Sequence, residues 1–156
     1  MVKILFVCLG NICRSPMAEA IFRKKVKDQG LDKIVTIDSA GTGRWHIGNP
    51  PHEGTIEILK QNQIDASGLK ARQVSEDDLQ SFDYVIGMDT ENVGNLRALA
   101  GHHGKAEVAR LLDFIPNYQL ADVPDPYFTG NFEEVFDLIS DGCDHLLSYI
   151  REKEQI

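Results

Sequence analysis

Four short apolar segments alternate with longer stretches of helical periodicity, and this alternation restricts the folds open to the chain. The expected strands are residues 3–7, 35–39, 84–88 and 107–112. Short runs of mostly apolar residues are typical of strands buried on both faces of a parallel sheet. Alternating strands and helices build βαβ units. The pattern predicts one three-layer α/β domain over residues 1–156, with a doubly wound, four-stranded parallel sheet and helices on both faces.

The expected helices lie between and after these strands, at residues 16–29, 52–62, from 89 or 90 to about 100, and 131–152. The last is the clearest, because its apolar residues follow the helical period over its whole length. The remaining segments 40–51, 65–74 and 118–130 lack such a pattern, and we expect them to be loops that carry the functional site.

Composition limits the partners and the compartment. The 156 residues carry a net charge of −8, which argues against nucleic acid or an anionic membrane surface as a general partner. The cysteines Cys8, Cys13 and Cys143 do not form a disulfide framework. We find no pattern of a signal peptide and no apolar run of membrane-spanning length. These features predict a cytoplasmic protein, with nonclassical export as an open alternative.

The stretch from Cys8 to Pro16, CLGNICRSP, lies between the first expected strand and the first expected helix. Cys8 therefore lies at the carboxyl edge of the sheet, where open α/β folds bind ligands. We expect Ser15 to cap the helix and Pro16 to lie in its first turn. The loop amides, the helix dipole and the Arg14 guanidinium can then hold a phosphate. The same positive field favours the Cys8 thiolate, which can attack the bound phosphorus.

Two motifs carry a resemblance to a known family. Residues 7–19, VCLGNICRSPMAE, resemble the signature of the low-molecular-weight protein tyrosine phosphatases, and residues 123–130, VPDPYFTG, resemble that family's Asp-Pro-Tyr acid loop. The resemblance covers nearly the whole chain, because the family is one small domain of this length. It implies hydrolysis of phosphotyrosine in a protein substrate through a phosphocysteine intermediate, with inorganic phosphate as the product and no cofactor or metal.

Within this resemblance each residue of the two motifs has an expected role. Cys8 is the nucleophile, Arg14 clamps the phosphate, and Asp125 is the general acid that protonates the phenol oxygen. Ser15 can donate a hydrogen bond to the thiolate, and Asn11 tolerates a left-handed backbone within the turn. The phosphate-binding loop comprises the residues that follow the nucleophile, namely Leu9, Gly10, Asn11, Ile12, Cys13 and Ser15.

Two further residues are expected to support the loop from outside it. Ser39, after the second strand, resembles a family residue that orients Asn11. Asp89 follows the third strand and either pairs with Arg14 or caps the next helix. Some family members complete this network with a His in the segment matching residues 64–72, but this segment contains none. Ser67 or a water molecule is the expected replacement.

The rim of the site is expected to be aromatic. Trp45, Tyr127 and Phe128 resemble the family's walls, which clasp an aryl phosphate deeply enough for phosphotyrosine to reach the nucleophile. The family's arginine phosphatases carry Thr where this chain has Ile12, which favours phosphotyrosine. His46 flanks the Gly-Asn-Pro-Pro stretch at residues 48–51 and can touch the substrate. The exposed aromatic side chains are compatible with a monomer or a weak dimer.

Cys13 has a second expected role. It lies in the same loop as Cys8, so a reversible disulfide between them can protect the nucleophile from irreversible oxidation. The family resemblance supports this role, and a small buried apolar residue is the alternative. Cys143 lies on the apolar stripe of the last helix, and we expect it in the core.

Three other functions stay open. An arsenate reductase shares this scaffold and loop, but its reaction needs further cysteines to relay a disulfide, and only Cys143 lies downstream. A protein arginine phosphatase is disfavoured by Ile12. A phosphate-binding module without catalysis would need neither the thiol of Cys8 nor the acid Asp125.

Overall fold

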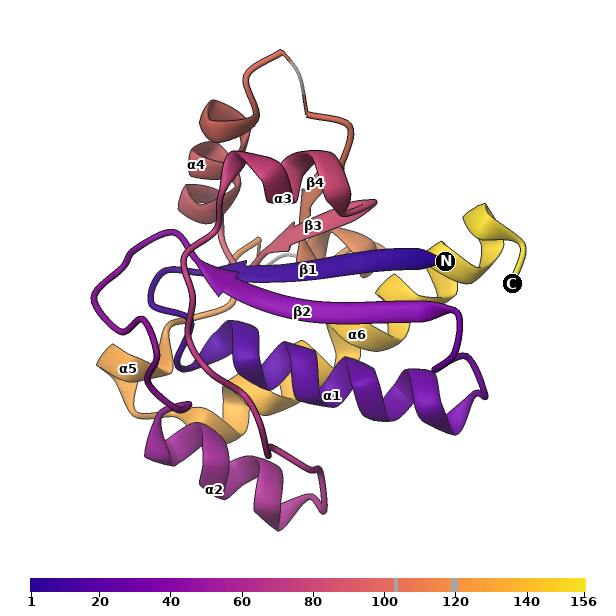
Figure 1. Cartoon of the computed structure of the whole chain (residues 1–156). Helices are drawn as coiled ribbons and strands as arrows, with labels where there is room; N and C mark the ends of the chain where they lie inside the picture. The colour runs from indigo at the N-terminus through magenta and orange to yellow at the C-terminus, as the bar shows by residue number, and fades with distance from the viewer. Residues whose placement is uncertain (103, 119–120) are drawn as a thin grey trace.

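A four-stranded sheet, parallel throughout, forms the centre of the protein (Figure 1). The computed structural model describes residues 1–102, 104–118 and 121–156. The strand order is β2–β1–β3–β4. The strands are β1 (Val2–Cys8), β2 (Val35–Gly41), β3 (Tyr84–Gly87) and β4 (Glu107–Arg110). The predicted parallel sheet is confirmed, and β1 lies inside it with neighbours on both sides.

Helices cover both faces of the sheet (Figure 1). One layer contains α1 (Arg14–Asp28), α2 (Glu53–Gln61) and α6 (Phe132–Glu154), and the opposite layer contains α3 (Glu76–Ser81) and α4 (Thr90–Ala100). The helix α6 packs along α1, so the last segment of the chain covers the helix that follows the Cys8 loop. The predicted three-layer arrangement is therefore present.

The alternation of side chains along β1 decides which way its last residue points. Ile4 and Phe6 belong to the large core beneath α1 and α6, whereas Leu5 and Val7 belong to the smaller core beneath α3 and α4. Because the side-chain period of a strand is two, Cys8 falls on the same face as Ile4 and Phe6. The fold therefore places the Cys8 thiol on the side of the sheet where α1 begins.

Some boundaries differ from those expected from the sequence. The fourth strand ends at Arg110 rather than at residue 112, because Leu111–Phe114 form a 3-10 turn, η1, whose two leucines are buried. An apolar run does not distinguish a strand from a buried turn. The four-residue α5 (Pro126–Thr129) lies in the segment 118–130 that was expected to be a loop, and α3 lies where the sequence predicted no element. Both helices are too short to show a helical period.

Candidate active site

The loop between β1 and α1 is held against the segment that follows β2. The Thr42 amide donates to the Cys8 carbonyl at 2.9 Å, and the Gly43 amide donates to the Leu9 carbonyl at 2.8 Å. A Cβ atom on Gly41 would lie 2.9 Å from the Leu9 carbonyl oxygen and 3.1 Å from Cβ of Asn11. Glycine at position 41 therefore permits the close approach that shapes the loop.

Asn11 lies at the centre of the loop and organises it. Its backbone adopts the left-handed region with φ of 56°, as the sequence suggested. Its carboxamide nitrogen donates to Ser15 Oγ at 2.7 Å and to Ser39 Oγ at 3.0 Å. Its carboxamide oxygen accepts a hydrogen bond from the Arg72 amide at 3.0 Å. The structure thus brings Ser39 to Asn11, and it uses the main chain of Arg72, not Ser67, to complete the network.

Ser67 lies elsewhere, on the protein surface. Its amide and hydroxyl both donate to the Asp65 carboxylate, at 2.9 and 3.0 Å. The expectation that Ser67 supports Asn11 is therefore wrong. The reason is local, because a serine two residues after an aspartate readily closes an Asx turn with it.

The Cys8 thiol is almost fully buried and lies within reach of two polar groups. Its Sγ atom lies 3.0 Å from Ser15 Oγ, and the Asn11 amide donates to it at 3.2 Å. The expectation that Ser15 caps α1 is wrong, because the helix begins at Arg14 with Cys13 at the N-cap and no capping side chain. The Ser15 hydroxyl instead faces the thiol and Asn11, and it also lies 3.4 Å from the Ala40 carbonyl oxygen.

Arg14 is buried, and its guanidinium is fixed from several directions. Nη1 donates to Asp89 Oδ2 at 2.8 Å and to the Val123 carbonyl at 2.9 Å, and Nη2 lies 3.5 Å from Asp125 Oδ2. Among the residues that the structure describes, the buried Nε atom has no hydrogen-bond partner. An unpaired buried donor is costly, so this atom is suited to binding an anion that enters the site.

Asp89 performs both of the roles that the sequence left open. Its Oδ2 atom pairs with Arg14 at 2.8 Å. Its Oδ1 atom accepts a hydrogen bond from the Asn92 amide at 2.8 Å and so caps α4. One carboxylate therefore couples the start of a helix to the orientation of the guanidinium.

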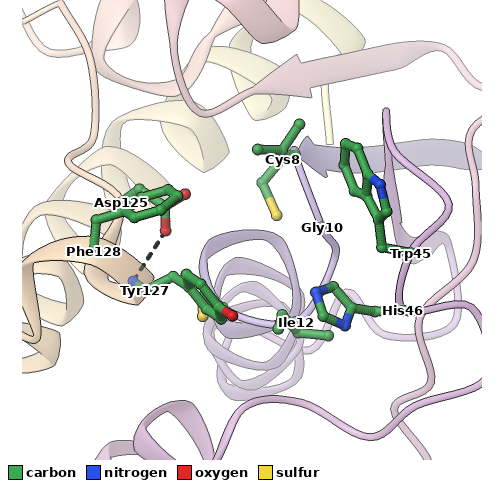
Figure 2. A pocket seen from close by; sticks show the side chains of 10 residues that line it. Cys8, Gly10, Ile12, Trp45, His46, Asp125, Tyr127 and Phe128 are labelled. Carbon is green, nitrogen blue, oxygen red and sulfur yellow. Dashed lines mark hydrogen bonds between the residues drawn. The ribbon is translucent and has the colours of Figure 1, made fainter.

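Asp125 is held at the edge of the pocket by the backbone around it. It is the N-cap of α5, and its Oδ1 atom accepts a hydrogen bond from the Tyr127 amide at 3.1 Å (Figure 2). Two residues earlier, the Val123 amide donates to the Met88 carbonyl at 2.9 Å. The segment carrying Asp125 is thereby tied both to the end of β3 and, through the Val123 carbonyl, to Arg14.

The pocket opens above the thiol and has an aromatic rim (Figure 2). The Cys8 sulfur faces the space between Asp125 and Tyr127 on one side and Trp45 and His46 on the other. Three segments line the pocket, namely the β1–α1 loop with the end of β1, the loop after β2 and the acid loop. The lining residues are Cys8, Leu9, Gly10, Ile12, Cys13, Trp45, His46, Asp125, Tyr127 and Phe128. The predicted rim residues are all present there.

The rim side chains are largely exposed to solvent, and their neighbours hold them in place. Trp45 is 70% exposed and Phe128 is 76% exposed. Tyr127 packs edge to face against His52, with ring centroids 5.9 Å apart. His46 lines the pocket opposite Tyr127, and its place beside the Gly-Asn-Pro-Pro stretch had suggested that it can touch the substrate. Exposed aromatic surface around a small opening is suited to a planar apolar group.

The other two thiols differ in position. Cys13 lines the pocket, and burial, followed by the nearby Cys8 and Asp125, raises its pKa to about 12. Cys143 is fully buried in the core, where the sequence placed it. Both, like Cys8, are free thiols.

Within the described ranges, no group of three or more His, Cys, Asp or Glu side chains is arranged to hold a metal ion. No described helix combines the length and apolar character needed to cross a membrane.

Comparison with known proteins assigns the family. Residues 3–156 match the family of low molecular weight phosphotyrosine protein phosphatases. The chain is 58% identical, over its full length and that of the relative, to the low molecular weight protein-tyrosine-phosphatase YfkJ of Bacillus subtilis. It is 46% identical to PtpA of Staphylococcus aureus over 150 residues, which are 96% of this chain and 94% of the relative.

Solved structures agree with the sequence comparison. The crystal structure of YfkJ from Bacillus subtilis superposes with a TM-score of 0.95 at 59% identity and covers 98% of this chain and 96% of that one. A Drosophila arginine phosphatase superposes with a TM-score of 0.89 at 32% identity, covering 96% and 98%. The chain therefore belongs to the low molecular weight phosphotyrosine protein phosphatase family and is a hydrolase of that class.

Proposed function

We propose that the protein hydrolyses phosphotyrosine in protein substrates and releases inorganic phosphate by way of a phosphocysteine on Cys8. One observation carries the proposal, namely that the Cys8 thiol and the Asp125 carboxylate line one pocket with an aromatic rim. The thiol supplies a nucleophile, the carboxyl supplies a proton, and the rim accepts an aryl group.

In the first step, Arg14 and the loop amides hold the phosphate oxygens while Cys8 attacks phosphorus in line. The S–P bond forms as the bond from phosphorus to the tyrosine oxygen breaks. Asp125 donates its proton to that oxygen, because a phenolate leaving group has a pKa of about 10 and departs poorly without it. Arg14 Nε, a buried donor without a partner among the described residues, is free to bind an equatorial oxygen.

In the second step, water attacks the phosphocysteine. Asp125 accepts the proton of the water, the S–P bond breaks, and phosphate leaves together with the regenerated thiolate. The Ser15 hydroxyl, 3.0 Å from Cys8 Sγ, can donate to the sulfur and stabilise its negative charge as it departs. Asn11 orients this hydroxyl through the 2.7 Å hydrogen bond from its carboxamide.

The rim supports phosphotyrosine as the substrate class. Ile12 presents an apolar side chain in the pocket, and Tyr127 and Phe128 form one wall. An arginine phosphatase is the second candidate, since the Drosophila enzyme of that name superposes on this chain. Phosphoarginine presents a polar guanidine with several N–H donors, which an apolar Ile12 accommodates less well than a phenyl ring. Arsenate reduction would need Cys143 as a relay, and that thiol is fully buried.

A substrate panel tests the assignment. The wild-type protein is assayed with a phosphotyrosine peptide, the matched phosphoserine and phosphoarginine peptides, and arsenate with a thiol donor. We expect hydrolysis of the phosphotyrosine peptide alone, and no turnover by Cys8→Ser with vanadate still bound. A preference for phosphoarginine, or Cys8→Ser turnover near that of the wild type, would reject the proposal.

Cys13 and the cellular setting belong to the same proposal. Cys13 lines the pocket with Cys8, so peroxide oxidation of the Cys8 thiolate to a sulfenic acid allows the Cys13 thiol to displace water and form a disulfide. Three free thiols favour the cytoplasm. The exposed rim allows a monomer or a weak dimer. Non-reducing mass spectrometry after peroxide treatment tests the disulfide, and irreversible Cys8 oxides alone would reject it. Cell fractionation tests the cytoplasmic location, and sedimentation at several concentrations tests the oligomeric state.

A further inference from the structure

We propose that Arg72 is a positioning residue, whose side chain holds the main-chain group that orients Asn11 and, through Ser15, the Cys8 thiol. The inference rests on the proposed function, because it concerns the thiol assigned there as nucleophile. Arg72 does not line the pocket, so its role is indirect. The residues that carry the inference lie on β1, β2, α1 and α3, in the loop between β1 and α1, and on the segment between α2 and α3.

The side chain of Arg72 joins the sheet to α3. Its two terminal nitrogens donate to the Asp78 carboxylate at 3.0 and 3.1 Å, in a bidentate pair, and its Nε donates to Asp38 at 3.1 Å. Asp38 belongs to β2, and Asp78 lies in the first turn of α3. The side chain of Asp78 is only 10% exposed, so this pair is less screened than one on the surface.

The main chain of Arg72 is fixed by the same arrangement. Its carbonyl accepts a hydrogen bond from the Gly41 amide at 2.8 Å, and its amide donates to the Asn11 carboxamide oxygen at 3.0 Å. The segment around position 72 belongs to no helix or long strand. A single parallel bridge between Gly41 and Gln73 and main-chain hydrogen bonds of Ala71 and Val74 hold it. The side-chain clamp adds stiffness at Arg72 to these few main-chain contacts.

The effect reaches the thiol through two further hydrogen bonds. The Asn11 carboxamide nitrogen donates to Ser15 Oγ at 2.7 Å, and that oxygen lies 3.0 Å from Cys8 Sγ. A carboxamide that loses the partner of its oxygen is freer to rotate, and its nitrogen then no longer aims at Ser15. Arg is needed because a lysine ammonium is a single point and cannot make the bidentate pair with Asp78 and the bond to Asp38 together.

The test compares Arg72→Met, which keeps the main-chain amide and the apolar stem but removes the clamp, with Arg72→Lys. Arg151→Met is the matched control, because Arg151 donates to Gln29 and to the Ile156 carbonyl, outside this network. The readouts are kcat and KM for a phosphotyrosine peptide and the pH midpoint of Cys8 alkylation by iodoacetate.

For Arg72→Met we expect kcat to fall about tenfold, the factor that matches one weakened hydrogen bond to a charged group, with KM changed less than about threefold. The midpoint of Cys8 alkylation should move to higher pH, because the thiolate loses a well-aimed donor. Arg72→Lys should lie between Arg72→Met and the wild type. Arg151→Met should match the wild type in all three readouts.

A folded Arg72→Met with wild-type kcat, or with a lower kcat but an unchanged alkylation midpoint, overturns the inference. An equal loss in Arg151→Met does so too. If Arg72→Met does not fold, Asp38→Asn carries the test, with a smaller loss of kcat and the same direction of the midpoint. Full turnover by Cys8→Ser would reject the proposed function itself, whereas an inactive Cys8→Ser beside an unaffected Arg72→Met rejects only the role of Arg72.

Discussion

Replacing Asp89 by Asn should loosen Arg14 while preserving the start of α4. Asn and Asp are equally good N-caps, so the substitution removes mainly the charge that faces the guanidinium. Breaking a fully buried pair costs about 3–5 kcal/mol, and breaking a surface pair costs about 0–1 kcal/mol. The Arg14 side chain is 3% exposed and that of Asp89 is 21% exposed. Arg14 also keeps the Val123 carbonyl and Asp125 as partners.

We therefore expect an intermediate loss in the free energy of unfolding, of about 2 kcal/mol for Asp89→Asn. Asp89→Ala removes the cap as well and should cost about 1 kcal/mol more. Because the Arg14 guanidinium, which we propose binds phosphate, is less well fixed, kcat/KM should fall about tenfold in both variants. Urea unfolding and steady-state kinetics with a phosphotyrosine peptide measure the two effects.

Asp113→Asn is the matched control, because Asp113 pairs with Arg110 and both side chains are substantially exposed. It should change stability by less than about 1 kcal/mol. An Asp89→Asn protein that unfolds at the same urea concentration as the wild type and keeps its kcat/KM would refute the role of the pair. Equal losses of stability in Asp89→Asn and Asp113→Asn would do the same.

Three further predictions concern the pocket. Asp125→Ala should slow aryl phosphates with poor leaving groups far more than activated ones, as a plot of kcat against leaving-group pKa will show, and an equal loss on both would contradict the acid role. Because the pKa of Cys13 is raised to about 12, first of all by burial, its thiol is protonated well above neutral pH, and iodoacetate at pH 7 should label Cys8 and leave Cys13 free in the peptide map. Labelling of both at similar rates would contradict this. A Cβ atom at Gly43 would lie 1.9 Å from the Trp45 ring, so Gly43→Ala should displace the indole. KM for aryl phosphates should then rise about threefold or more with kcat nearly unchanged. An unchanged KM would show that Trp45 does not contact the substrate.

The fold could be predicted from the sequence because its determinants are local. β1 is a run of apolar residues that is buried on both faces, and α6 shows the helical period over 23 residues. The elements that were missed are short. The six residues of α3 and the four of α5 are specified by capping side chains, Ser75 with Asp78 and Asp125 respectively, rather than by periodicity.

The site was predictable where its residues are consecutive or belong to a recognisable motif. Cys8 ends β1 and Arg14 begins α1, so the two proposed functional residues flank one short loop that the motif spans. The partners that hold the loop could not be predicted from the sequence in the same way, because several of them are main-chain groups. The Arg72 amide and the Val123 carbonyl carry no side-chain signal, and only the folded topology brings them to Asn11 and Arg14. The expectation for Ser15 failed because α1 begins one residue earlier, at Arg14, so Ser15 lies inside the first turn and its hydroxyl faces Asn11 and the thiol.

The anchoring of Val123 to Met88 and to Arg14 has a kinetic consequence. In many enzymes a loop must close over the bound substrate before the general acid reaches the leaving group. Here the segment that carries Asp125, the proposed proton donor, is tied through Val123 to Met88 and to Arg14, so we expect that no loop closure precedes proton transfer. We therefore expect kcat to be insensitive to solvent viscosity. Its temperature dependence should report the chemical step rather than a loop motion.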